Sequence, residues 1–225
     1  MSEESGLTTD FFIDTFAQMA DLVEEQRDYW SSLDSAIGDG DHGINLSIGF
    51  RKIKSELPQL KAADLTVEEL FKRIGRFVLN KVGGAAGPLY GSFFMKMGLG
   101  LGPKKKVTPI EFIIMLSQGL EAVKYRGKAK IGDKTLIDAL EPGILNLQEY
   151  SEGVDFLPHF SESLKLMKAG AESTRPIVAR KGRAARLGER SIGHLDPGAT
   201  SAWMLMTVFY EELVKVVQEE GIELK

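Results

Sequence analysis

The sequence predicts an all-α protein that forms a single domain over residues 1–225. Apolar residues recur at helical spacing along nearly the whole chain. No stretch alternates β-branched residues or carries a hairpin signal, and no Pro/Ser-rich linker divides the chain. With 43% hydrophobic residues among 225, the chain can bury one sizeable core. About eight helices with short connections indicate antiparallel neighbours.

The first half of the chain predicts four helices. The first is indicated by Phe12, Phe16, Met19 and Val23 at helical spacing, and the others are expected at about residues 44–57, 66–80 and 88–99. Pro58 should end the second helix, because proline removes a hydrogen bond from the helical ladder. The fourth helix is apolar nearly all round, as expected of a buried helix.

The second half predicts four more helices. They are expected at about residues 108–125, 133–150, 156–174 and 196–221. The first of them has a strong start signal, because Thr108 and Glu111 can form a capping box around Pro109. Either Asp133 or Thr135 can cap the next one.

Composition excludes several classes of protein. The formal net charge of −4 gives the whole chain no nucleic-acid footprint. The absence of cysteine excludes disulfides, thiolate nucleophiles and Cys-ligated metals, and three histidines make a His-rich metal site a poor fit.

No apolar run reaches the length of about 18 residues that a membrane span needs. Because the first five residues are polar and acidic, unlike a signal peptide, we expect a cytoplasmic protein without a membrane partner.

The most informative segment is residues 33–43, where Asp34, Asp39 and Asp41 are interleaved with glycines. Aspartates also cap helices and form turns, which is the simpler interpretation of any one of them. Three within eight residues instead favour an oxygen-only site for a hard cation such as Mg²⁺. His42 can be a packed or capping residue, and Asn45 can orient a ligand or face solvent.

Two glycine-containing segments precede predicted helices. In residues 83–92 small residues leave backbone N–H groups free for an anion, and Ser92 could add a hydroxyl. The alternative is a tight helix–helix turn in which only glycine fits. In residues 132–135 ordinary capping is the simpler interpretation, although Thr135 could also meet a nucleotide.

Residues 175–190 reverse the charge of the acidic chain. The segment holds six cations, Arg175, Arg180, Lys181, Arg183, Arg186 and Arg190, against the single acid Glu189. A solvated loop is one interpretation, and clamping of phosphate oxygens by arginine is the other. Together with the acidic segment and the glycine-flanked helix starts, the segment favours phosphoryl transfer. The glycines and charge of residues 175–195 also suggest a lid that is mobile without nucleotide and ordered with it.

The motifs occur in the order of a known family. They are Asp34-x4-Asp39-Gly40-Asp41-His42-Gly43, Gly87-Pro88-Leu89-Tyr90-Gly91, Gly132-Asp133-Lys134-Thr135, Ala179-Arg180-Lys181-Gly182-Arg183-Ala184 and Gly188-Glu189-Arg190-Ser191-x-Gly193-His194-x-Asp196-Pro197-Gly198-Ala199. Together they resemble the nucleotide-binding L subunit (DhaL) family of dihydroxyacetone kinases. The resemblance covers roughly residues 10 to 215.

The resemblance implies an up-and-down barrel of eight antiparallel helices with ADP or ATP and two Mg²⁺ at one end. It implies Asp34, Asp39 and Asp41 as metal ligands, which with Arg180 form the expected catalytic set. The expected nucleotide-binding residues are His42, Asn45, Gly83, Gly84, Ala85, Gly87, Leu89, Gly91, Ser92, Gly132, Lys134, Thr135, Arg183, Asp196, Pro197 and Gly198.

The resemblance further implies half of a kinase. A separate K subunit would hold dihydroxyacetone on a histidine, and a phosphotransferase-system M subunit would rephosphorylate ADP that stays bound. Alternatives remain open: ATP that exchanges, another small ketose such as erythrulose as substrate, or a nucleotide sensor without turnover. A homodimer is also left open by the sequence.

Overall fold

Helices make up almost all regular structure in residues 6–221 and 224, which the computed structural model describes. The α-helices are α1 (Thr9–Ile37), α2 (His42–Ala62), α3 (Val67–Lys81), α4 (Ala86–Met97), α5 (Pro109–Gly127), α6 (Leu136–Leu147), α7 (Phe156–Ser173) and α8 (Pro197–Glu220). A 3₁₀-helix, η1, spans Ala184–Ser191. The polar first five residues, which argued against a signal peptide, lie outside the described residues.

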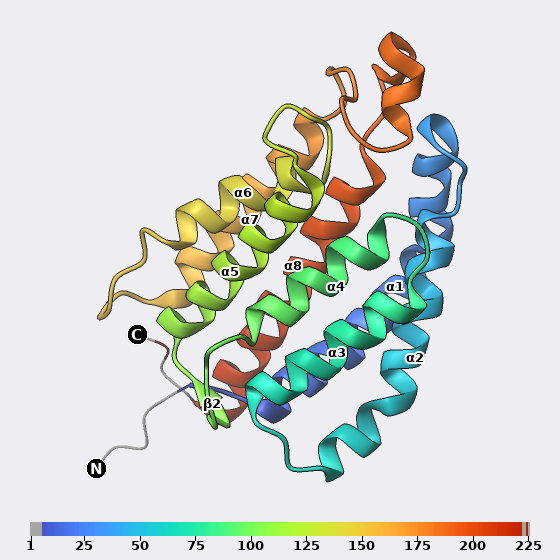
Figure 1. Cartoon of the computed structure of the whole chain (residues 1–225). Helices are drawn as coiled ribbons and strands as arrows, with labels where there is room; N and C mark the ends of the chain where they lie inside the picture. Colours follow the sequence, from blue (N-terminus) through green and yellow to red (C-terminus); the bar gives the residue numbers. More distant parts are fainter. Residues whose placement is uncertain (1–5, 222–223, 225) are drawn as a thin grey trace.

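The eight α-helices close into a ring. Each helix packs against the next one in the sequence, and α8 returns to pack against α1 as well as α7. Figure 1 shows the long helices running side by side in alternating directions. The predicted all-α, up-and-down arrangement is therefore confirmed.

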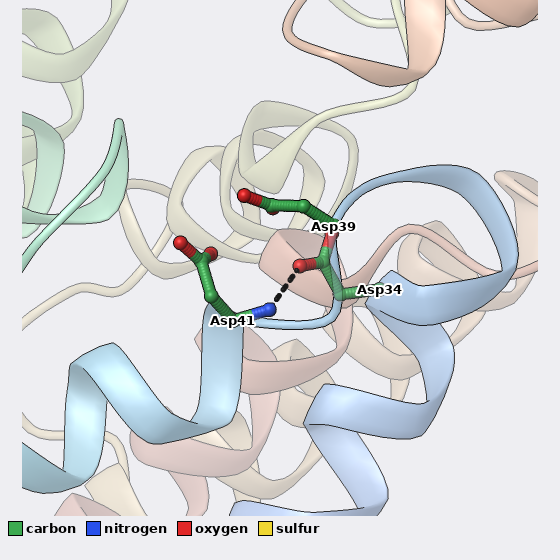
Figure 2. A group of neighbouring side chains, drawn as sticks. All are labelled: Asp34, Asp39 and Asp41. Atoms are coloured by element: carbon green, nitrogen blue, oxygen red, sulfur yellow. Dashed lines mark hydrogen bonds between the residues drawn. The ribbon is translucent and has the colours of Figure 1, made fainter.

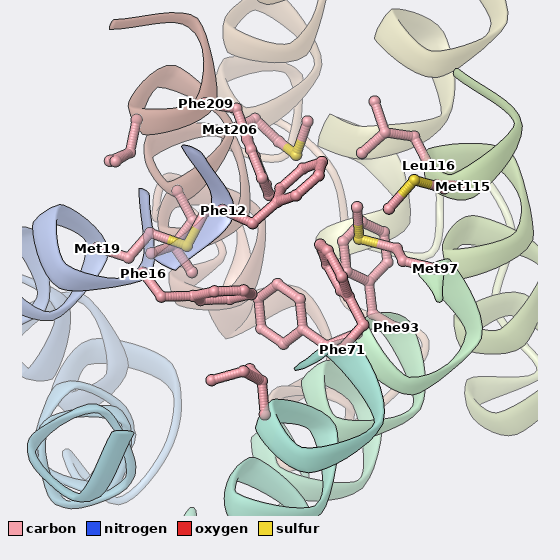
Figure 3. Close-up of a cluster of buried hydrophobic side chains, with 14 of the residues drawn as sticks. Phe12, Phe16, Met19, Phe71, Phe93, Met97, Met115, Leu116, Met206 and Phe209 are labelled. Carbon is pink, nitrogen blue, oxygen red and sulfur yellow. The ribbon is translucent and has the colours of Figure 1, made fainter. Parts of the chain in front are cut away.

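Aromatic side chains from opposite sides of the ring fill its centre. Phe12 of α1 packs edge-on against Phe71 of α3, with ring centroids 5.0 Å apart. Phe112 of α5 lies 5.9 Å from Phe12 and 5.3 Å from Phe209 of α8. Figure 3 shows Phe12, Phe71 and Phe209 in this cluster, with methionines such as Met206 and Met97 beside the aromatic rings. Because the centre of the barrel is apolar and filled, polar chemistry is confined to its ends and surface.

Local capping signals explain where several helices begin. Thr66 and Thr108 both form the capping box with the glutamate three residues later, as predicted for Thr108. Thr135, and not Asp133, caps α6, and Asp138 completes its capping box. The hydroxyl or carboxylate acceptors satisfy backbone N–H groups that the first helical turn leaves without partners.

The prediction that Pro58 ends the second helix is wrong. The helix α2 continues through Pro58 to Ala62. Leu57 and Leu60 are both buried, so a further turn of helix gains apolar packing, whereas Pro58 is exposed. The proline removes the N–H partner of the Lys54 carbonyl, and Lys54 and Pro58 are both exposed residues, so the loss falls on the solvent side of the helix.

Two further differences are smaller. A two-residue strand β1 (Leu7–Thr8) pairs antiparallel with β2 (Lys106–Val107), and two residues are too short for an alternating pattern. The helix α6 ends at Leu147 instead of Tyr150.

No described helix combines the length and the apolar character that a membrane crossing requires.

The up-and-down order decides where the polar segments meet. The breaks after α1, α3, α5 and α7 all fall at one end of the barrel, because successive helices alternate in direction. These are the four breaks that hold the acidic, glycine-rich and cationic segments, and β2 lies at the other end (Figure 1).

Candidate functional site

A cleft of about 480 Å³ opens at the end of the barrel where the four breaks meet. Each break contributes to its walls. The predicted site residues that line it are Asp34, Asp39, Asp41, His42, Asn45, Gly83, Gly84, Ala85, Leu89, Lys134, Thr135, Arg183, Asp196, Pro197 and Gly198. Among the described residues, the lining does not include Gly87, Gly91, Ser92, Gly132 or Arg180.

The three aspartates of the acidic segment converge at the cleft (Figure 2). Each of Asp34, Asp39 and Asp41 offers a carboxylate oxygen, and the three oxygens lie within 4.8 Å of one another. Such proximity of like charges is unfavourable without a cation, and carboxylate oxygens are the ligands that Mg²⁺ prefers. The donor set therefore fits a hard divalent cation.

Asp34 also has a structural role. Its Oδ2 accepts hydrogen bonds from the backbone N–H of Asp41 at 2.9 Å and of His42 at 3.2 Å. The carboxylate at the end of α1 thus caps the start of α2 and fixes the angle between the two helices. Two glycines permit this turn: a Cβ on Gly38 would lie 2.2 Å from Asp34 Oδ1, and Gly40 has a φ of +76°.

A cation from the opposite wall already reaches the acidic cluster. Arg183 donates from a guanidinium nitrogen to Asp39 Oδ2. Both side chains keep substantial exposure, 57% for Arg183 and 38% for Asp39. The cationic and acidic segments therefore face each other across the cleft mouth.

His42 is held inside the barrel end. Its Nε2 lies 2.8 Å from Ser201 Oγ, and the same hydroxyl lies 2.8 Å from the phenol oxygen of Tyr90. Burial lowers the pKa of His42 to about 4, so the imidazole is neutral near pH 7. The packed interpretation of His42 agrees with these contacts. Tyr90 and Ser201 were not among the predicted residues, since a buried hydroxyl has no sequence signature.

The glycine-rich break combines the two interpretations offered for it. Gly83 and Gly84 line the cleft, where a Cβ on Gly83 would lie 2.5 Å from Asn45 Oδ1. Gly87 instead faces the backbone, because its Cβ would lie 2.1 Å from the carbonyl oxygen of Val82. Gly91 packs on Leu79 of α3, where a Cβ would lie 3.0 Å from the Leu79 backbone. Glycine is needed here both for an open surface and for close helix packing.

Ser92 faces away from this cleft. It lines a second and larger groove, of about 950 Å³, between α4 and α5. Its distance from the other predicted ligands follows from its place in the second turn of α4. The suggested hydroxyl contact to phosphate therefore has no support from the geometry.

Hydrogen bonds within the protein hold the break before α6 in place. Gly132, with a φ of +89°, donates its N–H to Asp138 Oδ1 at 2.6 Å. The Lys134 ammonium is buried and donates to backbone carbonyls of the segment before α8, at 2.6 to 3.2 Å. The structure thus gives the Lys134 ammonium partners within the protein.

The cationic segment turns only part of its charge toward the cleft. Lys181, Gly182, Arg183 and Ala184 line it. Arg180 is exposed, and its backbone N–H bonds to the carbonyl oxygen of Asp133 at 3.1 Å. Of the two arginines singled out in the sequence, Arg183 is the one that the fold brings to the acidic cluster.

Asp196 lies at the floor of the cleft, at the N-cap of α8. Its Oδ2 accepts the backbone N–H of Ala199 at 2.7 Å. Burial raises the pKa of Asp196 to about 7, an effect that the Ala199 hydrogen bond and the nearby Lys134 charge only partly offset. The Asp196 carboxyl therefore titrates near neutral pH.

An apolar wall that the sequence did not identify completes the cleft. Ile37, Val123, Leu136 and Ile137 line it together with the predicted residues, and Arg126 stands at its edge. Apolar residues near helix ends cannot be told from core residues by spacing. The wall offers a flat aromatic group a place to bind, next to polar groups suited to phosphates.

Comparison with known proteins agrees with this geometry. The family model described as the DAK2 domain matches residues 36–211. The ADP-binding subunit DhaL of PEP-dependent dihydroxyacetone kinase 2 from Listeria innocua is 51% identical over 207 residues, covering 92% of this chain and 96% of the relative. The corresponding subunit of Escherichia coli is 38% identical, covering 86% of this chain and 92% of the relative.

A solved structure shares the fold. The dihydroxyacetone kinase of C. freundii in complex with AMP-PNP and Mg²⁺ matches with a TM-score of 0.69 at 24% identity. The match covers 94% of this chain and 36% of that one, so the present chain corresponds to about a third of the longer kinase. The matched domain and the two subunit relatives lead to one conclusion: the chain belongs to the DAK2-domain family, among the DhaL subunits of dihydroxyacetone kinases.

Proposed function

We propose that the chain is the ADP-binding subunit of a dihydroxyacetone kinase that uses Mg²⁺-bound nucleotide. The observation that carries the proposal is the meeting of the acidic cluster, the glycine-rich break and the cationic segment around one cleft. Relatives of nearly equal length carry the name of this subunit in PEP-dependent enzymes, which supports the same activity here.

The proposal assigns a role to each wall. Asp34, Asp39 and Asp41 hold two Mg²⁺ ions, which supply charge neutralisation at the phosphates when bound. Gly83, Gly84 and Ala85, at the start of α4, present backbone N–H groups to phosphate oxygens. The proposal leaves out the nucleotide contacts expected of Gly87, Gly91, Ser92, Gly132 and Lys134. Gly87 and Gly91 pack against α3, Ser92 lines the other groove, the Gly132 N–H bonds to Asp138, and the Lys134 ammonium bonds to backbone carbonyls.

The remaining walls position the nucleotide. Thr135 and the Asp196–Pro197–Gly198 turn border the nucleoside, and the apolar wall takes the adenine. Arg183 and Lys181 stabilise negative charge on the outermost phosphate, while Arg180 stands farther out. This division suits phosphoryl transfer, in which the protein mainly positions groups and neutralises charge.

The acceptor and the phosphate source are assigned to partners. Dihydroxyacetone would be held by a K subunit, and retained ADP would be rephosphorylated in place by a phosphotransferase-system M subunit. The names of the PEP-dependent relatives support a multi-subunit enzyme. Substrate choice would then reside mostly in the partner.

The first experiment identifies the nucleotide. The chain is purified with Mg²⁺, dialysed at length and denatured, and any released nucleotide is identified by mass spectrometry. About one ADP per chain supports a retained cofactor, as expected for a site where phosphate contacts dominate. A protein that comes out empty but binds added ATP reversibly overturns rephosphorylation in place. Dihydroxyacetone phosphate formation with K and M partners then separates a kinase subunit from a sensor.

A matched pair of variants tests the metal assignment. Asp39→Ala should abolish nucleotide retention and leave the helical circular dichroism signal unchanged. Asp21→Ala removes the same charge from an exposed position of α1, where the carboxylate pairs only with Lys54 among the described residues, and should retain nucleotide. Full activity of Asp39→Ala with the partner subunits would contradict the assignment.

A further inference from the structure

The Lys134 side chain is the most completely buried charge at this end of the barrel, with 1% of its surface exposed. Its Nζ donates to the carbonyl oxygens of His194 at 2.6 Å, Ser191 at 2.7 Å and Thr174 at 2.8 Å, and it lies 3.2 Å from that of Ile177. An ammonium has three hydrogens and no acceptor, so these carbonyls use all of them.

The carbonyls come from both ends of one segment. Thr174 and Ile177 follow α7, whereas Ser191 and His194 precede α8. We call residues 174–179 and 191–194 the base of the segment, and residues 180–190 its tip. The ammonium therefore ties the two halves of the base together, and the tip, which carries five of the six cations, projects from this base.

Other hydrogen bonds reinforce the base. The N–H of Ala179 donates to Ser191 Oγ at 2.9 Å, and that of Gly193 donates to the carbonyl of Arg175 at 2.8 Å. Each of these bonds connects the part of the base that follows α7 with the part that precedes α8. The Lys134 ammonium differs from them, because it comes from the break between α5 and α6 and so fixes the base to the body of the barrel.

Both the backbone conformation and the buried charge of Lys134 cost free energy. Its φ of +63° lies in the left-handed region that lysine rarely adopts. A buried ammonium is also costly unless it is fully hydrogen-bonded. The Thr135 N–H donates to Asp138 Oδ2 at 2.7 Å, which holds the neighbouring backbone. A surface loop that only bridged two helices would need neither the strained backbone nor the buried charge.

We propose that Lys134 is a positioning residue, whose ammonium orders the base of the 174–194 segment and thereby places Lys181 and Arg183 at the cleft. It acts through the segment and not by contact with phosphate. The base is then ordered before nucleotide arrives, and only the tip responds to binding. What the tip contacts rests on the proposed function, whereas the ordering of the base does not.

The absence of cysteine from the chain allows a direct test of the charge. Lys134→Cys introduces a single thiol, which is alkylated in mild denaturant before refolding. Aminoethylation restores an ammonium at the end of a side chain of lysine length, and propylation gives a neutral side chain of similar size. Lys130→Cys, at an exposed position of the same break, is carried through the same treatments as the control.

The first readout needs no nucleotide. A protease that cleaves after arginine reports on Arg180, Arg183, Arg186 and Arg190 in the tip. We expect cleavage there at least about tenfold faster in the propylated Lys134→Cys protein than in the wild type, because loss of the tie opens the base locally. Aminoethylation should restore slow cleavage. Equal cleavage of propylated and aminoethylated proteins overturns the proposal.

The second readout is ADP affinity with Mg²⁺, which should fall in the propylated protein and recover on aminoethylation. If aminoethylation restores protease resistance but the wild type binds no ADP, the proposed function is wrong. The ordering role of Lys134 would still hold in that case. If Lys134→Cys does not fold, hydrogen exchange of the nucleotide-free wild type tests the ordering of the base, because the N–H groups of Ala179 and Gly193 should exchange at least about tenfold more slowly than those of the tip. Equal exchange in the base and the tip would then overturn the proposal.

Discussion

Arg183 and Asp39 form an ion pair between two segments that lie 144 residues apart in the sequence. Asp39 belongs to the acidic cluster, and Arg183 belongs to the cationic tip. The pair places a positive charge where the three carboxylates converge. A divalent cation that takes Asp39 as a ligand must therefore compete with Arg183, so metal binding and the position of the tip are coupled.

The first prediction concerns this competition. Arg183→Gln should raise the affinity of the nucleotide-free protein for Mn²⁺, because the carboxylate no longer pairs with the guanidinium. An exposed ion pair contributes about 0.2–1 kcal/mol, which corresponds to a gain of up to about fivefold. The same variant should lower phosphoryl transfer, since a cation is lost from the cleft. Mn²⁺ binding is measured by electron paramagnetic resonance.

Arg186→Gln is the matched control for Arg183. It removes the same charge from the same tip, and among the described residues Arg186 neither lines the cleft nor pairs with Asp39. It should leave Mn²⁺ affinity almost unchanged. An equal gain in both variants would mean that the general field of the segment, and not the pair, weakens metal binding.

The second prediction separates the aspartates. Asp34→Ala should destabilise the metal-free protein by about 1 kcal/mol, because the N–H groups of Asp41 and His42 lose their capping acceptor. Asp39→Ala loses an exposed ion pair but also removes one of three converging carboxylates, so the two effects offset each other and the free energy of unfolding should change by less than about 0.5 kcal/mol. Urea unfolding in a chelator measures both. Equal destabilisation would contradict a capping role for Asp34.

The sequence was sufficient to predict the fold and the meeting of four segments. Helical periodicity and start signals such as the Thr108 box located the helices, and alternating directions bring every second break to one end. The Pro58 prediction failed because apolar packing of Leu57 and Leu60 outweighed the lost hydrogen bond. Such a balance depends on neighbours that the local sequence does not contain.

The sequence could not decide where side chains within a break point. Lys134 and Thr135 are adjacent, yet the Lys134 ammonium is directed into the 174–194 segment, whereas Thr135 caps a helix at the cleft. Gly83 and Gly87 belong to one motif, but only Gly83 lines the cleft. Spacing gives the position along the chain, and side-chain direction comes from the packing around it.

Gly87 therefore supports a third prediction, about packing. Gly87→Ala should destabilise the protein by about 1–3 kcal/mol, because its methyl group would meet the Val82 carbonyl oxygen and force α4 away from α3. Gly127→Ala adds the same methyl group at the end of α5, where its nearest neighbour is a Leu89 methyl at 3.4 Å. Gly127→Ala should therefore lower the stability of the protein only slightly. Thermal unfolding of both variants makes the comparison.

The packing prediction also concerns ligand binding. If Gly87 serves packing and not phosphate contact, the folded Gly87→Ala protein should keep its ADP affinity at a temperature below its unfolding transition. Loss of ADP binding without loss of stability would instead favour the phosphate contact that the sequence suggested.

The last prediction concerns pH and the buried carboxyl of Asp196. Its pKa is raised from 3.8 to about 7 by burial, with Asp138 and Asp34 raising it further and Lys134 opposing. Between these two values the folded protein keeps a proton that the unfolded chain has released. The free energy of unfolding contributed by this group therefore falls as the pH rises from about 4 to about 7. Asp196→Asn should remove that fall, since the amide does not titrate and its oxygen can still accept the Ala199 N–H.

The measurement is thermal unfolding of wild type and Asp196→Asn from pH 5 to pH 8, without metal or nucleotide. The stability of the variant relative to wild type should increase from pH 5 to about pH 7 and level off toward pH 8. Asp155→Asn is the same substitution at the exposed N-cap of α7. The stability of this variant should depend on pH in the same way as that of the wild type. Parallel curves for Asp196→Asn as well would show that the Asp196 carboxyl is already ionised at pH 5, because Lys134 and the α8 N-terminus then outweigh the cost of burial.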